Sequence, residues 1–258
     1  MKLDSLYTEM LDSGILKVTI NCPATLNALN MQVLEDLEEV FRTFNRDRGV
    51  RVIILTGAGE KAFIAGADIE QMSDMGPLEF REYIHHLSGL ATLMDECEKP
   101  LIGAVKGFTF GGGNIVAMHC DLIFASDDSS FGQQEINLGI MGGLPRLAYL
   151  VGLRRAFDIV VTGRILNAKE AEEIGLINKC MPREELDSFV LKYCQKLVAK
   201  PAVAMTLIKA SKRMCEKTAI DMSLKYEDEL MSLCFASTDA REGLKAFVEK
   251  RKPVYTGR

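Results

Sequence analysis

Two glycine-rich segments and one glutamate are the residues of this chain best suited to chemistry. The segments are Ala65-Gly66-Ala67 and Gly111-Gly112-Gly113, and the second opens a stretch with helical spacing. Glycine leaves backbone N–H groups uncovered, and such groups at a helix start stabilise negative charge. Glu135 could move a proton next to a carbonyl whose oxygen these groups hold. The pattern is the minimum needed for enolate chemistry.

Each feature also has a purely structural interpretation. A glycine triplet is expected wherever a tight turn packs a strand closely against a helix. Asp68, directly after Ala67, could simply cap a helix. A single glutamate such as Glu135 is more often an exposed surface acid than a catalytic group. Residue types alone therefore leave the structural and the functional interpretations open.

Composition excludes several classes of protein. The chain has 258 residues, 48% of them hydrophobic, and a net charge of −5, which suits one large α/β domain. Its seven cysteines are scattered and never spaced as C-x-x-C, which argues against a zinc ribbon or a disulfide framework. We expect no metal and, because the chain is acidic and lacks Trp, no nucleic-acid partner. The sequence shows no membrane-spanning or signal-peptide pattern, so we expect no membrane partner and a cytoplasmic or organelle-matrix location.

Short apolar runs alternate with helical patterns over the first two thirds of the chain. Strands are expected at 15–20, 51–56, 101–105, 121–125 and 177–181. Helices are expected at 31–45, 77–98, 146–151, 154–162 and 168–174, and the inward face of 77–98 would carry Leu78, Ile84 and Leu87. Only helices are expected after residue 182, at 184–199, 201–216, 219–236 and 239–250. We predict an α/β core at 1–182 and a helical region at 183–258.

Taken together, the motifs resemble the crotonase family, that is, the enoyl-CoA hydratase/isomerase superfamily. The matching motifs are Asn27-Ala28-Leu29, Ala65-Gly66-Ala67-Asp68-Ile69, Gly111-Gly112-Gly113, Phe131-Gly132-Gln133-Gln134-Glu135-Ile136, Leu138-Gly139-Ile140, Gly175-Leu176-Ile177 and Ala246-Phe247-Val248-Glu249-Lys250-Arg251. The resemblance implies an α/β fold of the ClpP/crotonase type, a spiral of ββα units with a helical C-terminal trimerisation region. It also implies a homotrimer or a hexamer built as a dimer of trimers.

The same resemblance implies a substrate and a site. The substrate would be an acyl-CoA thioester, with no separate cofactor. The N–H groups of Ala67 and Gly112 would form the oxyanion hole for the thioester carbonyl, and Glu135 would transfer protons. The residues implied to contact CoA or the acyl group are Ala24, Leu26, Ala28, Ala65, Gly66, Asp68, Ile69, Glu70, Gly111, Ile115, Phe247 and Lys250. Phe247 and Lys250 would reach the CoA of a neighbouring subunit.

Ile115 is the main departure from the family's hydratases. They carry a first glutamate two positions after the glycine triplet, where this chain has Ile115. Asn114 lies one position earlier on the predicted helix, so its side chain would point about 100° away. Hydration uses two groups to hold a water, whereas a 1,3-proton shift needs one carboxylate. Because Δ3,Δ2-enoyl-CoA isomerases show this single-glutamate pattern, we expect an isomerase that converts a 3-enoyl-CoA into a 2-enoyl-CoA.

Two alternatives stay open beside the isomerase. One is an enoyl-CoA hydratase, either of low activity or specialised, for example for a cyclic or conjugated acyl-CoA. The other is a non-catalytic acyl-CoA-binding member of the family. The segment 140–145 is shorter than the glycine-rich loop that shapes the acyl pocket of typical hydratases, so the sequence does not specify the acyl group.

Overall fold

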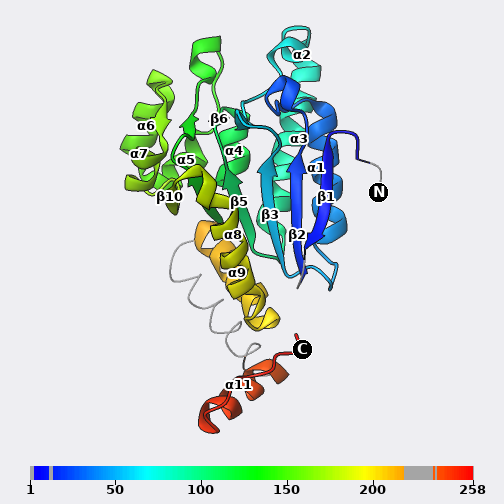
Figure 1. Cartoon of the computed structure of the whole chain (residues 1–258). Helices are drawn as coiled ribbons and strands as arrows, with labels where there is room; N and C mark the ends of the chain where they lie inside the picture. Colours follow the sequence, from blue (N-terminus) through cyan, green and yellow to red (C-terminus); the bar gives the residue numbers. More distant parts are fainter. Residues whose placement is uncertain (1–2, 12–13, 218–234, 236, 258) are drawn as a thin grey trace.

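The computed structural model describes residues 3–11, 14–217, 235 and 237–257, without the side chains of residues 247 and 248. In these residues the strands form two sheets, and helices pack around them (Figure 1). The larger sheet has the strand order β1 (Leu6–Leu11), β2 (Ile15–Ile20), β3 (Val52–Gly57), β5 (Leu101–Val105), β7 (Leu122–Ser126) and β10 (Lys179–Met181). The smaller sheet has the order β4 (Ala62–Ile64), β6 (Phe108–Phe110), β8 (Ser130–Gly132) and β9 (Leu166–Asn167).

Successive strands of the chain lie alternately in the two sheets, so the path of the backbone forms a spiral. Strands β3, β5 and β7 lie in the larger sheet, and each is followed by a short strand, β4, β6 or β8, in the smaller one. A helical segment follows each pair: α2 (Ile69–Ser73) with α3 (Pro77–Glu96), then α4 (Gly112–Met118), then the 3-10 turn η3 (Glu135–Leu138) with α5 (Leu144–Val151). This ββα repeat confirms the expected fold class.

Parallel pairing explains why the central strands are apolar along their whole length. Ile54 pairs with Ile102 and Ala104 with Phe124 in parallel register, while β1 runs antiparallel to β2 at the edge. A strand between two parallel neighbours has both faces covered, so its side chains are buried and polar residues there would lose their contact with solvent. Because parallel strands end at one edge, the connections after β3, β5 and β7 gather there.

Alternate residues of one strand enter two different cores. Ile53 and Leu55 of β3 pack with helices α1 (Met31–Phe44) and α3 on one face. Val52 and Ile54 face the opposite way and pack with helix α8 (Arg183–Val198). This alternation follows from the two-residue period of a strand. Helix α8 therefore lies directly on the larger sheet, although it begins just after the predicted boundary at residue 182.

Most of the expected elements are present, with small shifts of their ends. The described helices that remain are α6 (Leu153–Thr162), α7 (Ala168–Glu173), α9 (Ala202–Lys217) and α11 (Thr238–Val248). The helix expected at 219–236 lies outside the described residues, apart from residue 235. The strands β1, β4, β6, β8 and β9 were not among the strands expected from the sequence. The four strands of the smaller sheet are too short, at two or three residues, for a periodic pattern.

Buried ions hold α9 against the core. The Lys209 ammonium lies 2.7 Å from a carboxylate oxygen of Asp121 and donates to the carbonyl of Lys99 at 2.8 Å. Glu216 accepts from Arg146 of α5 at 3.0 Å. Such pairs are costly to break once buried, so they fix how α9 leaves the sheet. No helix in the described segments is long and apolar enough to cross a bilayer.

Candidate active site

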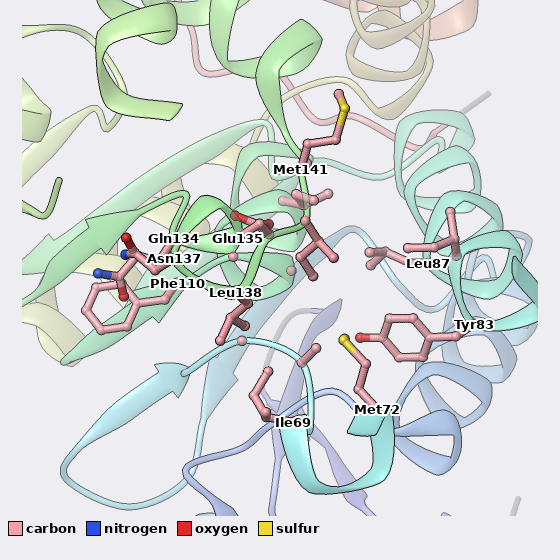
Figure 2. A pocket seen from close by; sticks show the side chains of 18 of the residues that line it. Ile69, Met72, Tyr83, Leu87, Phe110, Gln134, Glu135, Asn137, Leu138 and Met141 are labelled. Atoms are coloured by element: carbon pink, nitrogen blue, oxygen red, sulfur yellow. The ribbon is translucent and has the colours of Figure 1, made fainter. Parts of the chain in front are cut away.

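The two glycine-rich segments and Glu135 meet around one cavity of about 300 Å³ (Figure 2). Ala65, Gly66 and Ala67 reach it after β4, and Gly111 and Gly112 reach it after β6. Glu135 enters at the start of η3, after β8. The ββα repeat thus delivers one part of the site per turn, which confirms that these residues converge.

The backbone around Ala67 is oriented by a short parallel bridge to Leu29. The Leu29 N–H donates to the Gly66 carbonyl at 2.8 Å, and the Asp68 N–H donates to the Leu29 carbonyl at 3.0 Å. In a parallel bridge the residue between these two bonds directs its own N–H to the other side. The Ala67 N–H therefore points away from Leu29 and toward the cavity, which Ala67 lines.

Gly112 supplies the second N–H group. It is the first residue of α4, so its N–H has no partner inside the helix. A Cβ atom on Gly112 would lie 3.9 Å from the Ala67 nitrogen and 3.2 Å from the Leu29 side chain. Within the described part of the chain, neither the Ala67 nor the Gly112 N–H has a hydrogen-bond acceptor. Two neighbouring free donors suit an oxyanion.

Gly113 allows α4 to approach β4 closely enough for this arrangement. A Cβ atom there would collide with the Ile64 carbonyl oxygen and would lie 2.7 Å from the Ile64 Cβ. We expect Gly113→Ala to lower the free energy of unfolding by about 1–3 kcal/mol, because overpacking forces the backbone to shift. Chemical denaturation of both proteins measures this loss.

Gly89→Ala is the matched control for Gly113→Ala. Gly89 also lies within a helix, α3, but a Cβ atom there would be 3.4 Å from the nearest atom, an ordinary contact. Removing a helical glycine with room for a methyl group should leave stability unchanged or raise it. Equal stability of the two alanine variants would contradict the close approach of α4 to β4.

The Glu135 carboxylate lies between two glycines. One of its oxygens would be 3.3 Å from a Cβ on Gly111 and 3.0 Å from a Cβ on Gly142. Its other oxygen is buried and has no hydrogen-bond partner among the described residues. Burial raises the pKa of Glu135 above its usual value, because the charged form loses hydration. A carboxyl group in these surroundings is suited to taking up and returning a proton.

Ile115 faces the same cavity, whereas Asn114 does not. Asn114 is buried, its side-chain amide lies 3.0 Å from that of Gln133, and neither residue lines the cavity. Among the described residues that line the cavity, Glu135 is the only carboxylate. As expected for consecutive residues of a helix, the two side chains point in different directions, and only that of Ile115 lines the cavity.

The opposite wall comes from α2 and α3, and the sequence predicted it in part: Ile84 and Leu87 were expected on an inward face, whereas Met72 and Tyr83 were not. Figure 2 shows Met72, Tyr83 and Leu87 directed toward the cavity from these helices. The predicted inward face was wrong at Leu78, which is 78% exposed, whereas Ile84 and Leu87 both line the cavity. Tyr83 and Leu87 are four residues apart and share one helical face, and that spacing could have indicated Tyr83.

The remaining residues implied to contact CoA have varied positions. Ile69 lines the cavity, whereas Asp68 caps α2 by accepting from the Gln71 N–H at 3.1 Å, and Glu70 is exposed in the first turn of that helix. Ala24 and Leu26 line a separate hollow, and Ala28 lines neither. The hollow adjoins the site, since the Ala65 N–H donates to the Leu26 carbonyl at 3.1 Å.

Phe247 and Lys250, the last two residues implied to contact CoA, belong to the C-terminal part of the chain. Lys250 is exposed directly after α11, which Figure 1 places far from α2. The side chain of Phe247 lies outside the described part of the structure. Contact of either residue with the CoA of a neighbouring subunit stays a prediction, as does the assembly itself.

Comparison with known proteins supports one family. A family model described as enoyl-CoA hydratase/isomerase matches residues 11–258. The short-chain-enoyl-CoA hydratase of Clostridium acetobutylicum is 38% identical over 255 residues, covering 98% of this chain and 97% of that protein. The crotonyl-CoA hydratase of Syntrophomonas wolfei is 40% identical over 236 residues, covering 90% of this chain and 91% of that protein.

Solved structures agree with this assignment. The enoyl-CoA hydratase of Bacillus anthracis superposes with a TM-score of 0.96 at 30% identity, covering 99% of this chain and 100% of that one. A Geobacillus kaustophilus enoyl-CoA hydratase subunit gives 0.94 at 34% identity, with 100% of both chains covered. These relatives are named hydratases, so their names favour the hydratase alternative over the isomerase expected from Ile115.

Proposed function

The chain belongs to the enoyl-CoA hydratase/isomerase family, also called the crotonase family, and from this premise we propose that it transforms enoyl-CoA thioesters by proton transfer at Glu135. The observation that carries the proposal is the position of one carboxylate beside two unpaired backbone donors. The donors suit a thioester oxygen, and the carboxylate suits the carbon next to it.

The N–H groups of Ala67 and Gly112 would donate hydrogen bonds to the thioester carbonyl oxygen. As negative charge builds on that oxygen, the two donors stabilise it without rearranging, which lowers the barrier to an enolate. The apolar wall formed by Met72, Tyr83 and Leu87 would hold the acyl chain and limit the access of water. Coenzyme A would enter as part of the substrate, not as a separate cofactor.

Hydration is one reaction that this arrangement can perform, and the names of the relatives favour it. Glu135 would take a proton from water as the water oxygen bonds to C3 of a 2-enoyl-CoA. The resulting enolate would rest on Ala67 and Gly112, and Glu135 would return the proton to C2. With Ile115 in place of a second carboxylate, the water is held by one acid–base group instead of two, so the step should be slow.

Isomerisation is the second reaction, and the apolar side chain of Ile115 favours it. Glu135 would take a proton from C2 of a 3-enoyl-CoA and return it to C4, leaving the double bond between C2 and C3. No water takes part, so one carboxylate is sufficient, and an apolar neighbour protects the dienolate from water.

A panel of acyl-CoA thioesters tests the proposed function and separates the two reactions. We expect turnover of crotonyl-CoA or of 3-hexenoyl-CoA, followed by mass spectrometry and by absorbance of the conjugated thioester. Hydration adds the mass of water, whereas isomerisation keeps the mass and creates conjugation. Thioesters that bind in a calorimeter while none of the panel is converted would contradict an enzymatic function and support an acyl-CoA-binding role.

A further inference from the structure

We propose that the Tyr83 hydroxyl is a positioning group for the oxyanion hole and that it acts through the backbone of Leu29. This inference rests on the proposed function, because it concerns the same two N–H groups. It assigns to helix α3 a role in setting the geometry of donors that belong to other elements of the chain.

Tyr83 lies where such a role is possible. Its side chain is 2% exposed, and its ring points from α3 toward the cavity (Figure 2). The hydroxyl donates to the Leu29 carbonyl at 3.2 Å. Burial, followed by the nearby charges of Asp68 and Glu135, raises the pKa of Tyr83 above its usual value. The hydroxyl therefore keeps its proton and remains a donor.

Leu29 connects this bond to both oxyanion donors. Its carbonyl accepts from Tyr83 and also from the Asp68 N–H, so both of its lone pairs are used. Its own N–H holds the Gly66 carbonyl, and these two backbone bonds enclose Ala67. Its side chain would lie 3.2 Å from a Cβ on Gly112. Leu29 thus bonds to the residues on both sides of one donor, Ala67, and its side chain lies next to the other, Gly112.

Helix α3 supports the same geometry at a second point. Leu87, one turn after Tyr83, would lie 3.9 Å from a Cβ on Gly112. The helix therefore bonds to the Leu29 backbone through Tyr83 and places Leu87 beside Gly112. A displacement of Leu29 relative to α3 would change the separation of the Ala67 and Gly112 donors. Small errors in the placement of catalytic groups cost large factors in rate.

The test removes only the hydroxyl oxygen. We expect Tyr83→Phe to lower kcat by about 10- to 100-fold and to change KM by less than about threefold, because transition-state stabilisation is lost while the apolar wall stays. Tyr7→Phe is the matched control, since Tyr7 lies on β1 outside the cavity lining and is 46% exposed. A kcat for Tyr83→Phe equal to that of the control would overturn the inference.

A binding measurement gives a readout that a purely structural role would not move. The probe is 4-dimethylaminocinnamoyl-CoA, whose absorption moves to longer wavelength when its carbonyl is polarised by hydrogen bonds. It would be bound to Glu135→Gln, which prevents turnover, with and without Tyr83→Phe. We expect a clear shift with Tyr83 present and a smaller shift in the double variant.

The outcomes separate this inference from the proposed function. An equal shift in both proteins would overturn the role of Tyr83 and leave the oxyanion hole intact. No shift, or no binding, in Glu135→Gln with Tyr83 present would contradict the oxyanion hole itself, and with it the proposal on which this inference rests. Thermal unfolding of each variant shows whether a loss of signal comes from a loss of folded protein.

Discussion

Glu135→Gln should lower kcat by about 10²- to 10⁴-fold on whichever enoyl-CoA is turned over, because the cavity would lose its acid–base group. Glutamine keeps the shape of the side chain but does not take up a proton at neutral pH. Steady-state kinetics with the active thioester measures the loss. Glu184→Gln, at an exposed position in α8, is the matched control and should retain wild-type activity.

The pH dependence of turnover gives an independent check on Glu135. Both proposed reactions begin with the ionised carboxylate, so activity should fall as the pH is lowered through the pKa of Glu135. Burial raises that pKa, so the acid limb should lie above about pH 4.3, the ordinary pKa of a glutamate. An acid limb at or below that value would contradict the buried carboxylate.

The contribution of Glu135 to the free energy of unfolding should change with pH in the opposite direction from activity. A pKa that is higher in the folded than in the unfolded chain means that folding favours the protonated group. The contribution of Glu135 to stability is then fully present at low pH and is lost as the pH rises through the folded-state pKa. Glu135→Gln should therefore unfold at a higher temperature than the wild type at neutral pH, and at nearly the same temperature in acid. A lower unfolding temperature at neutral pH would show that the ionised carboxylate stabilises the fold.

Ile115→Glu should raise kcat/KM for hydration of crotonyl-CoA by about 10²-fold, because it adds a second acid–base group that can hold the water. The same change should lower the rate of isomerisation of 3-hexenoyl-CoA, since a polar side chain admits water beside the dienolate. The ratio of the two activities, measured on one preparation, is the quantity to compare.

Ile115→Gln separates the effect of charge from the effect of shape. Glutamine matches the size of glutamate but is no acid or base, so it should lower isomerisation without raising hydration. Equal hydration rates for the two variants would show that Ile115 does not occupy the place of a missing catalytic group. Neither substitution touches the Ala67 and Gly112 donors, so binding of the thioester should persist in both.

Local patterns in the sequence were sufficient for most of the scaffold. The continuous apolar run that became β3 identified a strand with both faces covered. Asn30 caps α1, because its side chain accepts from the Val33 N–H at 2.9 Å, and asparagine is a residue type typical of helix starts. Such features depend on neighbours a few residues away, so sequence spacing contains the information. The short strands β4, β6 and β8 lacked such a pattern and depend on pairing with each other.

Residue types along the chain specify which chemical groups are available: two glycine-rich turns, Glu135, and an isoleucine at position 115. Three relations come from the folded molecule alone: the Ala67 and Gly112 donors are neighbours, the Glu135 carboxylate lies between Gly111 and Gly142, and Tyr83 bonds to Leu29. The physical reason is that residue type fixes local backbone preference and chemistry. Contacts between distant segments arise from how whole strands and helices pack, and spacing along the chain does not encode those distances.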